Sequence, residues 1–159
     1  MMDRVNEILR HPVFSAHLAK LETLEQARIF CRHGLPHLLD VARMMWIASL
    51  ERQLPLSREV VYATALLHDL SRVEQIEEGI PHHQASAQLA ARILPDAGFE
   101  GKEIALIQDA IAAHRSDGGE NNLGQLLYWA DKKSRACRMC PAKDECNWPD
   151  EKKNWEITR

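Results

Sequence analysis

The sequence lacks a long apolar run. No stretch of about 18 apolar residues occurs, so we expect no membrane span. The N-terminal sequence MMDRVNEILRHPVF mixes charged with apolar residues and does not have the form of a secretory signal. Basic residues are not in excess either, and the formal charge of -3 argues against nonspecific nucleic-acid binding. We therefore expect a cytoplasmic protein.

Strict alternation of polar and apolar residues, the mark of a half-buried strand, is also missing. The 7 prolines and 7 glycines fall mostly between stretches with apolar residues at helical spacing. A chain of 159 residues suffices for one core but is short for two domains. We predict an all-α protein with a single domain over residues 1–159, a core at about 29–134 and an irregular, cysteine-containing tail at 137–159.

The helical spacing of apolar residues, with proline and glycine at the breaks, sets the expected helix boundaries. Ser57 stands where a side chain can cap a helix. The glutamates just before Gly79 are expected in a solvated helix end or loop. The predicted helices cover residues 3–10, 12–32, 36 to about 54, 58–70, 81–94, 102–114 and 122 to about 137.

Several histidines and aspartates stand on or beside apolar helical faces. His68 and Asp69 end the apolar run LLHDL, His37 follows Pro36, and Asp131 lies in LYWADKK. Imidazole and carboxylate groups that are buried together are stabilised when they share a cation. Two imidazoles with two carboxylates suit Fe, Mn, Ni, Co or Zn, whereas calcium prefers oxygen ligands alone.

The order His37, His68-Asp69, Asp131 resembles the H…HD…D signature of the HD superfamily of metal-dependent phosphohydrolases. The local sequences ALLHDL and His-x-x-x-Val-Ala match as well, and the similarity spans about residues 29–134. The resemblance implies a compact helical bundle of the HD-domain type in which these four residues hold one divalent metal ion.

The segments PHHQASA and IAAHR are similar to those that supply a second ion in two-metal HD proteins. This similarity implies His82, in preference to His83, and His114 as further ligands, with Asp69 bridging two ions. The alternative is that these histidines lie on the surface or cap helices.

Four further residues are candidates for catalysis or substrate binding. The sequence HGLPH resembles an arrangement in cyclic nucleotide phosphodiesterases, which implies that His33 protonates the leaving oxygen. Arg72, Arg115 and Lys132 flank the candidate ligands and are expected to bind phosphate oxygens. The alternative for each of the three is a solvated surface charge.

Three cysteines, Cys137, Cys140 and Cys146, follow the segment that carries Asp131. Cys31 precedes His37 by as many residues as Cys137 follows Asp131, so antiparallel segments would bring all four thiols together. Four thiolates suit a structural zinc ion or an iron-sulfur cluster equally. The alternative is free thiols on a loose tail, and HD domains in general do not have this cluster.

The preferred functional hypothesis is a hydrolase that cleaves a phosphomonoester or phosphodiester of a small phosphorylated substrate, such as a nucleotide, with one or two divalent ions. The same ligand order also resembles the di-iron oxygenases of the HD superfamily, which implies oxygen activation instead. A third hypothesis is a non-catalytic metal or redox sensor. A homo-oligomer is also compatible with the sequence.

Overall fold

The computed structural model describes residues 1–157, and the regular elements within that range are helices. This confirms the all-α prediction. None of these helices has the length and apolar character needed to cross a bilayer. The elements are α1 (Asp3–Arg10), α2 (Pro12–Leu24), α3 (Leu35–Glu51), α4 (Arg58–Leu67), α5 (Arg72–Glu78), α6 (His82–Ile93), α7 (Gly101–Ala113), α8 (Asn122–Lys133) and the short 3-10 turns η1 (Cys137–Met139) and η2 (Asp150–Lys152).

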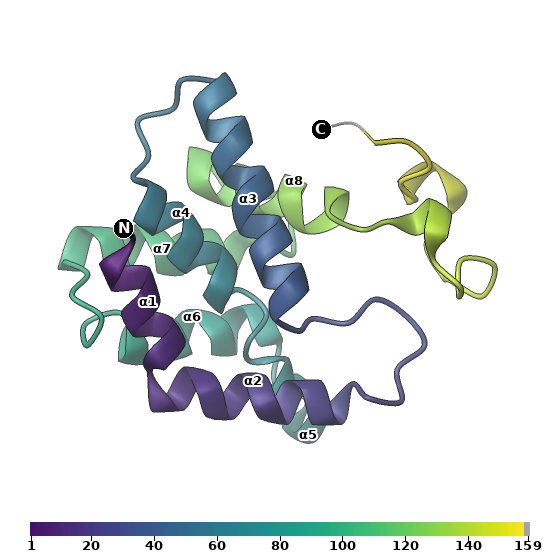
Figure 1. The fold of residues 1–159 in the computed structure, drawn as a ribbon, viewed down its shortest axis with the longest axis horizontal. Coiled ribbons are helices and arrows are strands. Elements are labelled where there is room, and N and C mark those ends of the chain that lie inside the picture. Colours follow the sequence, from purple (N-terminus) through teal and green to yellow (C-terminus); the bar gives the residue numbers. More distant parts are fainter. Residues whose placement is uncertain (158–159) are drawn as a thin grey trace.

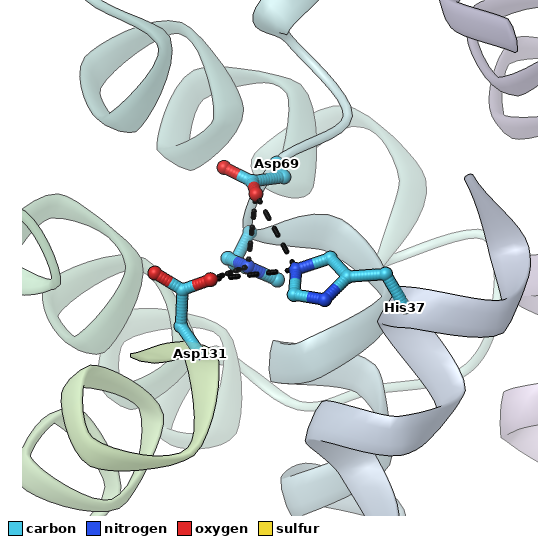
Figure 2. A group of neighbouring side chains, drawn as sticks. His37, Asp69 and Asp131 are labelled. Atoms are coloured by element: carbon cyan, nitrogen blue, oxygen red, sulfur yellow. Dashed lines mark ion pairs between the residues drawn. The ribbon is translucent and has the colours of Figure 1, made fainter. Parts of the chain in front are cut away.

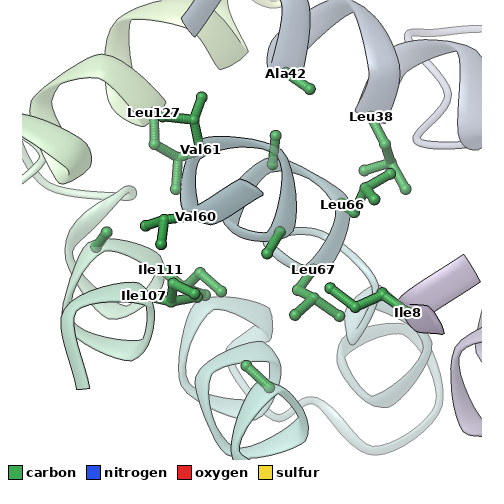
Figure 3. Packing of buried hydrophobic residues seen from close by; sticks show 14 of the residues in the cluster. Ile8, Leu38, Ala42, Val60, Val61, Leu66, Leu67, Ile107, Ile111 and Leu127 are labelled. Atoms are coloured by element: carbon green, nitrogen blue, oxygen red, sulfur yellow. The ribbon is translucent and has the colours of Figure 1, made fainter. Parts of the chain in front are cut away.

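Helix α4 forms the centre of the bundle. Its sequence REVVYATALL is apolar nearly all round, which is typical of a helix covered on every side. Leu67 points toward Ile8 of α1, while Val60 lies among Ile107 and Ile111 of α7 (Figure 3). Full burial of a side chain such as Leu67 contributes about 2 kcal/mol to folding. The core therefore fixes the position of the C-terminal end of α4, where the His68-Asp69 pair begins.

The helices around α4 form two groups. Helices α3 and α8 pack against each other and against α4, while α6 and α7 pack together on another side of it (Figure 1). Helix α1 covers α4, and α2 lies against α5. This arrangement directs residues from α3, α4, α6, α7 and α8 toward one region of the bundle interior.

The predicted helix over residues 12–32 was wrong at its C-terminal end, because α2 ends at Leu24. Glu25 follows with its carboxylate buried, where it accepts a hydrogen bond from the backbone N–H of His33 at 2.7 Å. Arg28 donates to the carbonyl of Cys31 at 2.9 Å. These bonds hold residues 28–34 as a loop, which passes beside the candidate site before α3 begins.

The predicted helix over residues 58–70 was also too long. Helix α4 ends at Leu67, and a separate helix α5 starts at Arg72 after a tight turn. Ser57 occupies the N-cap position of α4, but its side chain makes no capping hydrogen bond. The glutamates expected in a solvated helix end or loop belong to α5, where Glu77 and Glu78 form its exposed C-terminal end. Glu74 contacts His17 at 2.9 Å and ties α5 to α2.

The last α-helix, α8, ends at Lys133, short of the predicted Cys137. Beyond it the chain has turns and two 3-10 segments, as expected for an irregular tail. Asn154 returns to the end of α8, where its amide donates to the carbonyls of Lys132 and Arg135 at 2.7 and 2.9 Å. Because the last carbonyls of a helix have no partner within it, this contact caps α8 and anchors the tail.

Candidate metal centre

His68 and Asp69 occupy the turn between α4 and α5, and both are buried. The imidazole Nδ1 of His68 lies 2.7 Å from the carbonyl of Ala65, so Nδ1–H donates there and Nε2 faces inward. The backbone N–H of Ser71 donates to Ser86 Oγ at 3.1 Å, which fixes the turn against α6. The two side chains are thus held in a defined orientation by the surrounding helices.

The first helical turn of α3 supplies His37, and the last turns of α8 supply Asp131. Asp131 Oδ1 lies 3.4 Å from His37 Nε2 and 3.7 Å from His68 Nε2. Asp69 Oδ2 lies 3.7 Å from His37 Nε2 and 3.2 Å from His68 Nε2. Figure 2 shows the side chains of His37, Asp69 and Asp131 converging from three separate segments. One ligand atom from each of the four residues lies within 4.8 Å of all the others.

A second set adjoins the first and shares Asp69. His82 Nε2 lies 3.1 Å from Asp69 Oδ1 and 3.2 Å from His114 Nε2, and both histidines are buried. His83 is less buried and points elsewhere, with its ring centroid 6.3 Å from that of His114. The structure thus brings together His82, His114 and Asp69, and leaves His83 outside the set.

The Nδ1 hydrogen bonds of His68, His82 and His114 leave the Nε2 atoms of these rings facing one another. Nδ1 of His82 lies 2.7 Å from Gln75 Oε1, and Nδ1 of His114 lies 2.6 Å from the carbonyl of Ile111. With Nδ1–H donated in each ring, Nε2 is an acceptor when the imidazole is neutral. Nε2 of His68 is buried with no hydrogen-bond partner, and the carboxylate oxygen Oδ2 of Asp69 lies 3.2 Å from it. Convergent buried acceptors are stabilised by a cation, so the residues present fit metal ions.

The charges of the set formed by His37, His68, Asp69 and Asp131 also favour a bound cation. Burial alone would lower the pKa of His68, but the carboxylates of Asp69 and Asp131 outweigh it and raise that pKa to about 10. Burial would raise the pKa of Asp69, but interactions with His68 and with the nearby His114 and His37 hold it well below its usual range. The pKa of Asp131 is lowered in the same way by His37 and His68. Both carboxylates are therefore ionised and available to a metal ion.

The two oxygens of Asp69 serve different sets. Oδ2 faces His37 and His68, and Oδ1 faces His82 at 3.1 Å and His114 at 3.8 Å. A carboxylate in this position can join two ions, which is the geometry of two-metal sites in phosphatases and nucleases. The two sets together can hold one or two ions.

His33 lies at the edge of the first set, with Nε2 3.8 Å from Asp69 Oδ2. Its Nδ1 lies 2.6 Å from Glu25 Oε1 and donates to that carboxylate. Burial lowers the pKa of His33 to about 4, even though the hydrogen bond to Glu25 acts in the opposite direction. The hydrogen bond to Glu25 leaves Nε2 of His33 facing Asp69, and proton donation from His33 to a leaving oxygen stays a prediction. Sequence reasoning missed Glu25, the partner of His33, because that residue was assigned to a continuous helix.

Four cationic side chains lie near the histidine and aspartate sets, and three of them line the cavity next to Asp69. Arg72 contacts Glu25 at 3.4 Å, and Arg115 is exposed; both line a cavity next to Asp69. Lys132 does not line this cavity, because its ammonium lies 3.5 Å from the centroid of the Tyr128 ring. Arg135, which the sequence analysis missed, donates to His37 Nε2 at 3.0 Å and lies 3.5 Å from Asp131 Oδ1. Its spacing of four residues from Asp131 on a helical pattern is the signal that could have found it.

The cavity beside the two sets has a volume of about 530 Å³. Asp69, His82 and Asp131 form its floor together with His33. Its walls come from the loop after α2, the start of α5, the end of α7 and the tail, so segments far apart in sequence enclose it. The wall residues are Arg28, Phe30, Cys31, Arg72, Arg115, Arg135, Cys146, Asn147 and Trp148.

The four cysteines, which were expected to converge, line one neighbouring cavity of about 250 Å³. All four are free thiols; Cys137 is buried and the others are partly exposed. Burial raises the pKa of Cys31, and the other three thiols act in the same direction, while Arg135 opposes them. His37 lines this cavity too, so the thiols lie directly beside the histidine and aspartate sets.

Comparison with known proteins agrees with this geometry. Residues 34–136 match the model of the HD domain family. A protein of Clostridium beijerinckii described as an uncharacterized protein is 42% identical over 156 residues, which cover 98% of this chain and 99% of that protein. The crystal structure of a predicted HD superfamily hydrolase from an uncultured Thermotogales bacterium superposes with a TM-score of 0.68 at 19% identity, covering 90% of this chain and 80% of the other. At that identity the likeness concerns the fold.

Proposed function

This chain belongs to the HD domain family, and we propose that it is a metal-dependent hydrolase of a small phosphorylated molecule, with a nucleotide phosphomonoester or phosphodiester as the preferred substrate class. The observation that carries this proposal is the set of arginines around the cavity above Asp69 and Asp131. In a chain with a formal charge of -3, Arg28, Arg72, Arg115 and Arg135 line the same space.

These arginines favour an anionic substrate. Guanidinium groups donate two parallel hydrogen bonds to phosphate oxygens, which suits a phosphoryl group better than a neutral polyol. Phe30 and Trp148 in the same walls offer apolar surface for a base or another planar group. A volume of about 530 Å³ lies within the usual range of small-molecule sites, roughly 300–1000 Å³.

In this proposal His37, His68, Asp69 and Asp131 hold one divalent ion, and Asp69, His82 and His114 hold a second. When bound, such ions polarise phosphoryl oxygens and acidify water. Asp69 keeps the two positions together, because its two oxygens face different histidines. The buried hydrogen bonds of His68, His82 and His114 keep their Nε2 atoms directed inward without rearrangement.

His33 contributes as a neutral acceptor at the cavity floor. Its Nδ1–H is committed to Glu25, so Nε2 remains free to accept a hydrogen bond from water or from substrate. Arg72, which also contacts Glu25, lies beside it and can bind a phosphate oxygen. This places a hydrogen-bond acceptor and a cation at the same side of the cavity.

The test compares metal content and turnover in the wild-type protein and in Asp69→Ala. Protein purified without oxygen is loaded with Mn, Fe, Co, Ni or Zn, and phosphate release is measured on nucleotide monoesters, nucleotide diesters and bis(p-nitrophenyl) phosphate. We expect Asp69→Ala to lose both ions and to lower turnover by about 100-fold or more. Asp109→Ala removes an exposed carboxylate on α7 and serves as the matched control.

The outcomes separate the competing hypotheses. Phosphate release that depends on metal and on Asp69 supports the proposal. Substrate-dependent oxygen consumption by the iron-loaded protein, without phosphate release, contradicts it and indicates an oxygenase. Full metal loading with no turnover of any kind points to a sensor.

A further inference from the structure

The four cysteines come from two segments that meet beside the bundle. Cys31 lies in the loop between α2 and α3, and Cys137, Cys140 and Cys146 lie in the tail after α8. All four line the same cavity of about 250 Å³. The proposed hydrolysis uses none of these thiols. Four thiols from distant segments that line one cavity form a candidate binding site. The spacing of their sulfur atoms indicates what this site binds.

The four sulfur atoms are spaced more widely than the ligand atoms of either histidine and aspartate set. Zinc–sulfur bonds of about 2.3 Å place the four sulfur atoms about 3.8 Å apart. Among the described residues, no three of these sulfur atoms all lie within 4.8 Å of one another, whereas both histidine and aspartate sets meet that limit. In an iron-sulfur cluster the thiolates bind different iron atoms, so their sulfur atoms stand farther apart.

The charges around the cavity fit an anionic cluster. Three cationic residues, Arg135, Lys143 and Lys153, line it together with the cysteines, against one carboxylate, that of Asp40. In the four-iron form, two ferrous ions, two ferric ions, four sulfide ions and four thiolates combine with release of the thiol protons, and the product is negatively charged. Cationic side chains stabilise that charge, and Trp148 adds an aromatic side chain to the lining.

We propose that Cys31, Cys137, Cys140 and Cys146 bind an iron-sulfur cluster beside the histidine and aspartate sets. The proposal rests on the convergence of four thiols on one cavity, on their spacing and on the cations that line it. It does not depend on the hydrolase reaction.

The position of this cluster has a consequence for the larger cavity. Cys31 and Cys146 line the wall of the substrate cavity as well, next to Phe30 and Trp148. A cluster that joins the loop to the tail would hold both walls in place over Asp69 and Asp131. This consequence rests on the proposed function. Loss of the cluster should raise the KM for substrate about 10-fold and leave the metal content of the histidine and aspartate sets unchanged.

The experiment measures iron and acid-labile sulfide in the full-length protein. The protein is reconstituted without oxygen with ferrous and ferric iron and inorganic sulfide, and then examined by visible absorption and by electron paramagnetic resonance after reduction. We expect sulfide in amounts of about two or about four per chain, matching a two-iron or a four-iron cluster, with sulfur-to-iron charge-transfer bands. Cys140→Ala should remove sulfide and bands together.

Two controls keep the result interpretable. Met139→Ala changes an exposed residue between Cys137 and Cys140 and should retain the cluster. Asp69→Ala should also retain labile sulfide, so failure of the proposed hydrolysis and failure of the cluster proposal are distinguishable. Circular dichroism confirms that Cys140→Ala is folded. Absence of labile sulfide from the folded wild-type protein, or one zinc ion per chain that is lost in Cys140→Ala, would overturn the proposal.

Discussion

Glu25 illustrates how a single buried residue organises the candidate site. Its carboxylate accepts hydrogen bonds from both the backbone N–H and the Nδ1–H of His33 at 2.7 and 2.6 Å. Burial would raise the pKa of Glu25, but His33 and Arg72 lower it, so the carboxylate is ionised. Partners of this kind fix the tautomer and the ring orientation of a site histidine. Glu25 therefore acts on the site through His33.

Replacing Glu25 by Gln tests this positioning role. The amide keeps the size of the side chain but loses its charge and one of its two acceptor oxygens. We expect turnover to fall by about 10-fold or more, because His33 loses its fixed orientation. Metal content, measured by mass spectrometry, should stay at the wild-type level. Glu22→Gln, an exposed change one turn earlier on α2, should leave turnover unaltered, and equal effects of the two variants would contradict the assignment.

At the scale of elements, Arg4 ties α1 to two other helices. Its guanidinium contacts Glu59 of α4 at 2.8 Å and Glu103 of α7 at 2.7 Å. Glu103 also accepts the N–H of Glu100 at 3.0 Å and so completes a capping box at the start of α7. The hydrogen bond from Arg4 lowers the pKa of Glu103 below its ordinary value of 4.5. These partly exposed contacts join α1 to the bundle at its rim.

Glu103→Gln should therefore have a pH-dependent effect on stability. A carboxyl whose pKa is lowered by folding stabilises the protein above its unfolded pKa, and that stabilisation disappears as the pH falls through the folded pKa. At pH 7 we expect the variant to unfold with a free energy about 1 kcal/mol lower than the wild-type protein. The difference should shrink below about pH 4.5. Urea titrations between pH 3 and pH 7 measure it, and Glu7→Gln, in the exposed pair with Arg10, should show little change at any pH.

The loop before α8 depends on two glycines that touch. Gly118 has a φ of +88°, and a Cβ there would lie 2.5 Å from the carbonyl oxygen of Gly124. A Cβ on Gly124 would lie 2.0 Å from the carbonyl oxygen of Gly118. This close approach fixes where α8 starts and, through it, the position of Asp131 about two turns later.

Gly118→Ala should destabilise the protein by about 2 kcal/mol or more, because the backbone conformation is strained for alanine and the neighbouring backbone is too close. Thermal unfolding gives the measurement. Gly101→Ala is the matched control, since a Cβ there meets nothing within 4 Å and Gly101 lies at the start of a helix. Equal unfolding temperatures for the two variants would show that the Gly118 contact is not rigid.

At the scale of the whole molecule, the histidine and aspartate sets join segments that also pack together in the core. Their members come from α3, the turn after α4, α6, the end of α7, and α8. The imidazole nitrogens and carboxylate oxygens of these segments face one another in a buried space. A bound ion would be shared by these atoms and would connect five parts of the chain.

Metal binding should accordingly stabilise the fold as a whole. At a free metal concentration 1,000 times the Kd, the gain is about 4 kcal/mol, which corresponds to a rise in Tm of roughly 8–16 °C for a chain of this size. Calorimetry before and after chelation, with metal then restored, measures the shift. Asp69→Ala should show no response to metal. A response in Asp69→Ala as large as that of the wild-type protein would place the stabilising ion elsewhere.

The sequence by itself determined the fold class and pointed to the residues that converge. Apolar residues at helical spacing are a local property, so the all-α class and most helix starts followed from them. The order of His37, His68, Asp69 and Asp131 led to the HD family, of which the chain is a member. These signals can be recognised in the sequence because each depends on the spacing of residues along the chain.

The tertiary structure decided what depends on contacts between distant segments. Helix α2 ends before Glu25, whose carboxylate accepts a hydrogen bond from the backbone N–H of His33. Arg135 contacts His37 because α8 lies against α3. The tautomers that turn lone pairs of His68, His82 and His114 inward depend on carbonyl or amide oxygens positioned by folding. Burial likewise makes His33 a neutral acceptor, which no local pattern predicts, since the free energy of ionising a side chain depends on everything that surrounds it in space.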